Sequence, residues 1–324
     1  MYTYDDLYTI FSEELKKQNF TKEPTELYEP IRYAISQCGK RLRPILTLMA
    51  CDLFEVDIQH AIYQAIAIEL LHNFSLIQDD VMDQSPIRHG KITVYKKWSP
   101  NIAILAADTL YALAYKYIVQ AKVEKLPALL DTFNNTAIKT CTGQQMDLNF
   151  EKKATVTKDD YLLMSQLKTA LLFAASLKIG AIVAGAPEKD ANHLYNFGVN
   201  IGMAFQLKDD LLDVYGDEKV FGKKTGEDIL ENKKTFLFVS AMELADDKTR
   251  HTLMQLSSDT KLAPQDKINA IKIIFDQLNI RQHTEQAIDN YLDKGLLQLQ
   301  LVDRPAKSKV HLIRLANKMI QRIN

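Results

Sequence analysis

The sequence predicts an all-α protein, and three observations carry this prediction. The 324 residues include only 11 glycines and 9 prolines, about half the usual usage, which favours a few long helices over many strands. The expected helix breaks gather at a few places, near 85–87, 99–101, 185–187, 216–226, 263–264 and 304–305. No Ser/Gly-rich linker or internal repeat lies among them, so we expect one domain over residues 1–324.

The charge balance excludes several classes of partner. Lys and Arg number 40 against 41 Asp and Glu, a net charge of −1, so no overall positive field draws the chain to nucleic acid or to an anionic membrane. Any phosphate binding must come from local clusters.

The cysteines and the N-terminus indicate a cytoplasmic protein. Cys38, Cys51 and Cys141 are odd in number and widely spaced, which argues against a disulfide framework or a thiolate zinc site. The N-terminal residues carry acids where a signal peptide needs basic residues, and we expect no stretch with the length and apolarity of a membrane span.

The first basic segment is Gly39-Lys40-Arg41-Leu42-Arg43, which opens an apolar helix over 44–54. Lys40 and Arg43 would then project beside the positive end of the helix dipole and could hold an anion. A solvated basic N-terminal turn explains the same pattern equally well.

Two apolar segments, 61–83 and 192–213, carry acids near their carboxyl ends. Both are apolar nearly all round, so we expect buried helices. The first carries Asp79, Asp80 and Asp83 there. The second carries Asp209, Asp210 and Asp213.

The spacing of these acids predicts cation binding. The first and last aspartate of each set are four residues apart, so both carboxylates lie on one helix face. Like charges at that spacing and acids near a helix C-terminus are both unfavourable, so a cation should compensate. Carboxylates without His or Cys favour a hard cation, and Mg²⁺ with a substrate's phosphates fits best.

Ordinary acidic doublets supply a comparison within the chain. Asp5-Asp6, Asp159-Asp160 and Asp246-Asp247 lack the third aspartate, and charged runs are usually solvated helix faces. Two DDxxD patterns that each end an apolar helix favour the functional interpretation.

Further candidates for phosphate binding flank the acidic sets. Arg88-His89 follows the first set in an expected loop, Lys168-Thr169 lies inside an apolar run, and Gln206 precedes Asp209 by one turn. A buried lysine needs an anion or a path to water. After the second set come Lys223, Lys224, Lys233 and Lys234, of which some are surface residues.

Together these segments resemble the trans-type polyprenyl diphosphate synthases of the farnesyl and geranylgeranyl kind. The resemblance covers most of the chain, and its motifs occur in the family's order. They are GKRLRP at 39–44, DDVMD with RHG at 79–90, GQQMDL at 143–148, KT at 168–169, and FQLKDDLLD with GKKTGEDILENKKT at 205–235.

The resemblance implies an isoprenoid synthase fold, a helical bundle around a deep central cavity, assembled as a homodimer. It implies three Mg²⁺ ions held by Asp79, Asp83 and Asp209, with Asp80, Asp210 and Asp213 as ligands or support. The groups expected to assist the allylic diphosphate are Arg88, Lys168, Thr169, Gln206, Lys223, Lys224 and Lys233. Those expected to hold isopentenyl diphosphate are Lys40, Arg43 and His72.

Two positions depart from the family pattern. The family has a second arginine where this chain has His89, which implies weaker or pH-sensitive binding of isopentenyl diphosphate. The family's glycine before a later aspartate is replaced in Ala107-Asp108, which we interpret as a packing change.

The implied reaction is ionisation of the allylic diphosphate, attack by the double bond of isopentenyl diphosphate, and loss of a proton. It needs electrostatic stabilisation and no nucleophilic side chain. The growing tail would run down the helix before Asp79, where Phe74 lies five residues earlier, about 7–8 Å along the axis. An aromatic there resembles the twenty-carbon producers, although Phe74 can equally be plain core.

Three other interpretations of the function are compatible with the sequence. They are a farnesyl or longer-chain synthase, a terpene cyclase, and a non-catalytic subunit of a heteromeric synthase. A cyclase has no use for the second diphosphate site suggested by Lys40 and Arg43, and a non-catalytic subunit would be free to lose acids that this chain retains.

Overall fold

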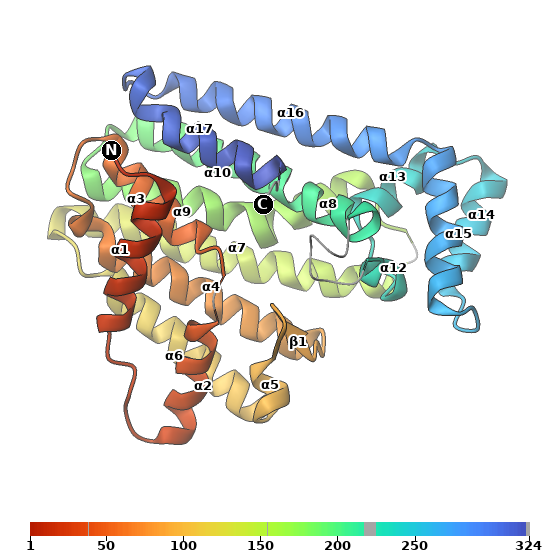
Figure 1. The fold of residues 1–324 in the computed structure, drawn as a ribbon, viewed down its shortest axis with the longest axis horizontal. Coiled ribbons are helices and arrows are strands. Elements are labelled where there is room, and N and C mark those ends of the chain that lie inside the picture. Colours follow the sequence, from red (N-terminus) through yellow and green to blue (C-terminus); the bar gives the residue numbers. More distant parts are fainter. Residues whose placement is uncertain (38, 154, 217–224, 322–324) are drawn as a thin grey trace. The chain divides into compact units, whose positions relative to one another are not determined.

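The computed structural model describes residues 1–37, 39–153, 155–216 and 225–321, and these are helical apart from connections and one small hairpin (Figure 1). The all-α prediction is therefore confirmed. The strands β1 (Ile87–Arg88) and β2 (Lys91–Ile92) pair antiparallel, with Ile87 opposite Ile92.

The bounds of the helices follow in chain order. The first half of the chain contains α1 (Tyr4–Lys17), α2 (Thr25–Ser36), α3 (Leu42–Leu53), η1 (Ile58–Ala61), α4 (Ile62–Met82), α5 (Val94–Lys97), α6 (Pro100–Ile118), η2 (Val123–Lys125) and α7 (Leu126–Lys152). The second half contains α8 (Lys158–Ser165), the π-helical turn η3 (Gln166–Ala170), α9 (Leu171–Ala184), α10 (Glu188–Tyr215), α12 (Glu227–Leu230), α13 (Phe236–Leu244), α14 (Asp247–Ser258), α15 (Pro264–Gln277), α16 (Ile280–Leu301) and α17 (Ala306–Gln321).

The predicted breaks fall between helices wherever the structure describes them. Helices α6 and α15 begin at Pro100 and Pro264, where proline's missing N–H costs no helical hydrogen bond. Residues 85–87 lead into the hairpin, while 185–187 and 304–305 separate successive helices. Most of the break at 216–226 lies outside the described residues.

The chain divides into two compact units of interleaved segments, and α7, α10 and α16 each contribute to both. Unit 1 comprises Met1–Thr140, Leu172–Gly198 and Leu297–Leu315. Unit 2 comprises Cys141–Leu171, Val199–Leu296 and Ala316–Asn324. A single domain over residues 1–324 stays a prediction.

The core of unit 1 is built around α4. This helix packs against α3 and α6, and every residue from 65 to 71 is buried. That burial agrees with the expectation that a helix apolar nearly all round lies inside. In unit 2 the core joins α10, α13 and α15 through Leu207, Leu237 and Phe275, among others.

Cationic side chains satisfy the carbonyl groups at several helix C-termini. In unit 1, Arg304 Nε donates to Leu53 O at the end of α3 (3.0 Å), and Lys309 Nζ donates to Gln300 O at the end of α16 (2.9 Å). In unit 2, Lys267 Nζ donates to Ser257 O at the end of α14 (2.6 Å), and Arg250 Nε donates to Met242 O near the end of α13 (2.9 Å). The last carbonyls of a helix have no hydrogen-bond partner within it, and a left-handed glycine after the helix often lets the backbone provide one. Here these cationic side chains donate to the carbonyls instead.

One helical stretch differs from expectation. Lys158–Ala184 is long and apolar enough to cross a membrane by length and composition, whereas we expected none. Of its most apolar window, 67% is buried inside the protein, as in the core helix of a soluble protein.

Candidate active site

The first acidic cluster lies at the C-terminus of α4. Asp79 and Asp80 occupy the last turn of the helix, and Asp83 is its C-terminal cap. The Asp83 amide donates to the Asp79 carbonyl at 2.8 Å, so the two residues are one helical turn apart, as their spacing predicts.

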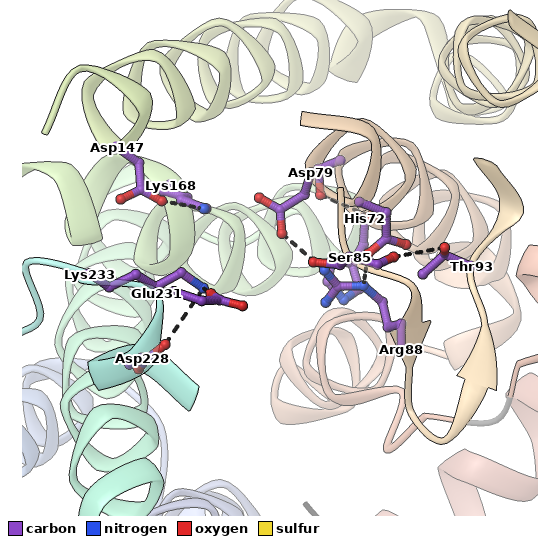
Figure 2. A network of polar contacts seen from close by, with 12 residues as sticks. His72, Asp79, Ser85, Arg88, Thr93, Asp147, Lys168, Asp228, Glu231 and Lys233 are labelled. Carbon is purple, nitrogen blue, oxygen red and sulfur yellow. Dashed lines mark hydrogen bonds and ion pairs between the residues drawn. The ribbon is translucent and has the colours of Figure 1, made fainter. Parts of the chain in front are cut away.

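Arg88 binds two carboxylates of this cluster (Figure 2). Its Nε donates to Asp80 Oδ1 at 2.6 Å, and its Nη2 donates to Asp79 Oδ2 at 3.0 Å. The hairpin that carries Arg88 is tied back by Thr93, whose hydroxyl donates to Ser85 O at 2.8 Å. Asp80 is only 4% exposed, and this burial raises its pKa to about 6 despite the nearby guanidinium. The negative charge of Asp80, the inner acid of the motif, is therefore balanced by Arg88 of the protein itself.

The basic segment at the start of α3 contacts α4 and α9 through Arg43. Arg43 Nη1 lies 3.1 Å from His72 Nε2, and its guanidinium stacks 4.4 Å from the ring centre of Phe173. Burial, and then the positive charge of Arg43, holds the pKa of His72 well below its ordinary value, so the imidazole is neutral at pH 7. Lys40 is exposed.

Arg41 fixes the path of that segment. It adopts a left-handed conformation (φ 45°) as the N-cap of α3, and its guanidinium pairs with the buried carboxylate of Glu69 on α4. The same guanidinium donates to Ile35 O near the end of α2. Three helices of unit 1 are thus joined through one side chain that the sequence analysis assigned no role.

His89 occupies the hairpin turn beside the basic segment. Its φ of 50° is left-handed, and its side chain is exposed. A Cβ atom added to Gly39 would lie 4.0 Å from His89 Cε1, so the RHG loop reaches the GKRLR segment.

Phe74 belongs to an aromatic cluster of unit 1. Its ring lies 5.3 Å from that of Tyr111 on α6, which in turn stacks on Phe133 of α7 at 6.2 Å. Phe74 is half-buried, whereas Phe133 is fully buried. Tyr111 was missed in the sequence because it belongs to another helix and no motif marks it.

The second acidic cluster lies in the last two turns of α10. Asp210 is 4% exposed, and its carboxylate accepts three hydrogen bonds. The donors are Tyr161 Oη at 2.5 Å, the Phe236 amide at 2.9 Å and Gln206 Nε2 at 2.9 Å. Burial, and then the charge of Asp228, raises the pKa of Asp210 to about 7. As with Asp80, the inner acid of the motif is held by the protein.

Asp213 anchors the chain that re-enters the described structure at Thr225. Its carbonyl accepts from the Gly226 amide at 2.6 Å, and its Oδ2 accepts from the Asp228 amide at 3.2 Å. Burial, followed by the charge of Asp228, raises the pKa of Asp213 to about 7.

Lys233 lies beside two acids of the same unit (Figure 2). Its Nζ is 2.8 Å from Glu231 Oε2 and 3.6 Å from Asp228 Oδ1, and its side chain is 42% exposed. Lys223 and Lys224, the other two candidate lysines, lie outside the described residues.

Lys168 and Thr169 occupy the π-helical turn η3, a local widening often found at functional sites. Lys168 Nζ binds Asp147 Oδ2 of α7 at 2.6 Å, which is the anion that a lysine in an apolar run requires (Figure 2). Thr169 Oγ1 donates to Gln206 Oε1 at 3.0 Å. Helix α7 packs closely against the backbone of η3 at Gly143. A Cβ atom on Gly143 would lie 2.4 Å from the Lys168 amide nitrogen, so this contact requires a glycine.

Several residues of the second cluster escaped the sequence analysis. Asp147 lies in the quoted GQQMDL motif and Asp228 in GKKTGEDILENKKT, so the motifs contained them without indicating their partners. Tyr161 lies in no motif, and only the folded chain brings its hydroxyl to Asp210.

The position within the helix separates these clusters from the ordinary acidic doublets. Asp6 and Asp160 lie in the first turns of α1 and α8, and Asp246 is the N-cap of α14, where acids are favourable. Hydrogen bonds to Thr3, Thr157 and Thr249, respectively, lower the pKa of these three exposed carboxyls. In the two DDxxD clusters the pKa values of the buried acids are raised instead. Folding alone accounts for the doublets but not for the clusters.

The donor chemistry of the clusters fits magnesium. Both offer carboxylate oxygens one turn apart and no cysteine or histidine at that turn, which suits a hard cation. No group of three or more His, Cys, Asp or Glu converges on one point within the described ranges.

Replacing Asp210 should destabilise unit 2 far more than replacing an acid of an ordinary doublet. In Asp210→Ala, the Phe236 amide, the Tyr161 hydroxyl and the Gln206 amide lose their acceptor, and we expect a loss of about 3 kcal/mol. Asp247, whose exposed side chain pairs with Arg250, is the matched control, with an expected loss below about 1 kcal/mol on Asp247→Ala. Urea denaturation in EDTA measures both, and equal losses would contradict the anchoring role.

Comparison with known proteins identifies the family of the chain. Residues 24–274 match the family model described as polyprenyl synthetase. A geranylgeranyl diphosphate synthase of Methanosarcina mazei is 34% identical over 92% of this chain and 90% of its own length.

Solved structures give the same result. A crystal structure of a geranylgeranyl pyrophosphate synthase matches with a TM-score of 0.95 and 38% identity, covering 99% of both chains. That of a geranylgeranyl pyrophosphate synthetase from Pyrococcus horikoshii matches with a TM-score of 0.91 and 33% identity, covering 98% of this chain and 99% of the other. The chain therefore belongs to the polyprenyl synthetase family of trans-prenyltransferases.

Proposed function

We propose that this protein condenses an allylic diphosphate with isopentenyl diphosphate to give a linear trans-prenyl diphosphate, with geranylgeranyl diphosphate as the main product. The observation that carries the proposal is the pair of acidic clusters at helix C-termini, where carboxylates oppose the helix dipole. The names of the relatives support the product.

The metal ligands of the proposal are three of the four outer acids of the clusters. Asp79, Asp83 and Asp209 would hold three Mg²⁺ ions, while Asp80, Asp210 and Asp213, each raised in pKa by burial, position them. When bound, magnesium supplies positive charge that stabilises the diphosphate as a leaving group.

Polar side chains would complete the allylic site. Arg88 already binds Asp79 and Asp80, so it can contact a diphosphate oxygen without losing its place. Lys168 is likewise oriented by Asp147. The remaining groups of this set are Thr169, Gln206, Lys233 and, outside the described residues, Lys223 and Lys224.

The basic segment before α3 would bind isopentenyl diphosphate without metal. Arg43 is oriented by Phe173 and by neutral His72, which does not add charge to an already cationic group. Lys40 is exposed and can reach a ligand. We place His89 in the same site because of its approach to Gly39.

The chemistry proposed for the site is charge stabilisation. The allylic C–O bond breaks and its electron pair leaves with the diphosphate, held by Arg88 and Lys168. The double bond of isopentenyl diphosphate then attacks the allylic carbon, and a proton passes to the released diphosphate as the new alkene forms. Thr169 and Gln206 are tied to each other, so their oxygen dipoles are fixed before the cation forms.

The reaction is tested by incubating purified protein with Mg²⁺, labelled isopentenyl diphosphate and dimethylallyl, geranyl or farnesyl diphosphate. We expect linear twenty-carbon alcohols after dephosphorylation, and none when EDTA is present. Cyclic hydrocarbons from the allylic substrate alone would indicate a terpene cyclase. Activity that requires an added partner chain would indicate a subunit of a heteromeric enzyme.

Phe74 should limit product length. Phe74→Ala opens the face of α4 towards Tyr111, and we expect products longer than twenty carbons. Tyr63→Ala, at an exposed aromatic on the same helix, is the control and should leave the product distribution unchanged. Chromatography of the alcohols measures both, and an unchanged distribution in Phe74→Ala assigns Phe74 to the core.

Exposed apolar residues on α6 and α7 support a homodimer. Leu105 is 59% exposed and Ile138 is 64% exposed, and the two helices meet where Tyr111 stacks on Phe133. Such side chains gather at interfaces between copies. Sedimentation velocity should show a dimer that Leu105→Asp dissociates and that Leu163→Asp, at an exposed apolar residue of α8, leaves intact.

A cytoplasmic location is part of the proposal. Cys51 and Cys141 are both free thiols, in agreement with a reducing compartment. Fractionation of the source cells tests it, and recovery in an exported fraction would contradict it.

A further inference from the structure

The hairpin that follows the first acidic cluster has a fixed register. Its turn consists of His89 and Gly90, whose φ angles of 50° and 73° are both left-handed, as a two-residue type I′ turn requires. Across this turn Arg88 pairs directly with Lys91. A shift of one residue would carry each side chain to the opposite face, so the turn decides where Lys91 points.

Contacts on the chain after Lys91 hold this strand in place. The Thr93 amide donates to Pro86 O at 3.1 Å, which continues the hairpin beyond its last strand pair. The Tyr33 hydroxyl of α2 donates to Ile92 O at 2.7 Å and so fixes the strand to a helix of the same unit. The backbone at Lys91 is therefore held between the turn and these two anchors.

The two faces of the hairpin differ in character. Ile87 and Ile92 lie directly opposite each other and are 62% and 51% exposed. Arg88 points from the other face toward the first acidic cluster, where its Nε donates to Asp80 Oδ1 at 2.6 Å (Figure 2). Because successive residues of a strand alternate between faces, Lys91 shares the face of Arg88, with the two Cβ atoms about 5 Å apart.

The charges on this face are not balanced within the protein. Two cations directly opposite each other are unfavourable in a hairpin. The charge of Arg88 is met by Asp79 and Asp80, with which its guanidinium pairs. Lys91 is exposed and forms no ion pair with any of the residues that the structure describes. An anionic group brought to this face by a ligand would balance the second cation.

We infer that Lys91 is a further diphosphate-binding residue, which acts with Arg88 as a cationic pair on the allylic diphosphate at the first acidic cluster. The inference rests on the proposed function, because it adds a residue to the allylic site. An ammonium group suits this ligand, since hydrogen bonds between charged donors and phosphate oxygens are short and strong. The shared face with Arg88 assigns Lys91 to the allylic substrate rather than to isopentenyl diphosphate.

The experiment measures binding to the full chain by titration calorimetry. The first probe is geranyl S-thiolodiphosphate with Mg²⁺, an allylic analogue whose C–S bond resists ionisation, and the second is isopentenyl diphosphate in EDTA. Lys91→Gln keeps a long polar side chain but removes the charge, and it should lower the affinity for the analogue about five- to tenfold. Its affinity for isopentenyl diphosphate should stay unchanged. Lys91→Arg keeps the charge and should bind the analogue as the wild type does.

Two matched variants separate the position of the charge from its mere presence. The double variant Lys91→Gln, Ile92→Lys restores the net charge but places it on the opposite face, and it should bind the analogue as weakly as Lys91→Gln. Lys96→Gln removes the same charge from an exposed lysine of α5 and should bind the analogue as the wild type does. Recovered affinity in the double variant, or an equal loss in Lys96→Gln, would assign the effect to overall charge and overturn the inference.

The remaining outcomes distinguish this inference from the proposed function. Unchanged affinity for the analogue in Lys91→Gln overturns the inference, and so does an equal loss of affinity for isopentenyl diphosphate. A wild-type protein that does not bind the analogue rejects the proposed function and the role of Lys91 together. A wild-type protein that binds it while Lys91→Gln is unaffected rejects the role of Lys91 alone.

Discussion

The structure depends on placing carboxylates where a helix tolerates them least. Asp79 and Asp80 occupy the last turn of α4, and Asp213 occupies the last turn of α10, where backbone carbonyls already concentrate negative charge. Burial adds a desolvation cost, seen in the raised pKa values of Asp80 and Asp210. A fold selected for stability alone has no use for this arrangement, and so it marks the site.

In each unit the inner and outer aspartates of the motif have different surroundings. The inner aspartate is turned to protein donors, namely Arg88 for Asp80 and the set of Tyr161, Gln206 and the Phe236 amide for Asp210. A buried carboxylate that accepts several hydrogen bonds is fixed in place. This agrees with the proposal that the inner acids position the motif while Asp79, Asp83 and Asp209 bind a cation.

Helix ends elsewhere show the complementary use of charge. With only 11 glycines in the chain, few helices can end on a left-handed glycine, and cationic side chains such as Arg304 and Lys267 donate to terminal carbonyls instead. The ordinary acidic doublets lie at helix N-termini, where Asp6 and Asp160 form capping boxes. The acids of these doublets therefore agree with the helix dipole, whereas those of the two clusters oppose it.

The sequence by itself determined the helical class, most of the helix breaks and the position of both clusters, because periodicity, proline placement and four-residue spacing are local properties of the chain. Only the tertiary structure decided which acid of each motif is buried, since two of the three donors to Asp210 come from α8 and from the start of α13, far away in sequence. The same holds for the Asp147–Lys168 pair and the Arg41–Glu69 pair. Contacts between distant segments depend on packing, which no local pattern encodes.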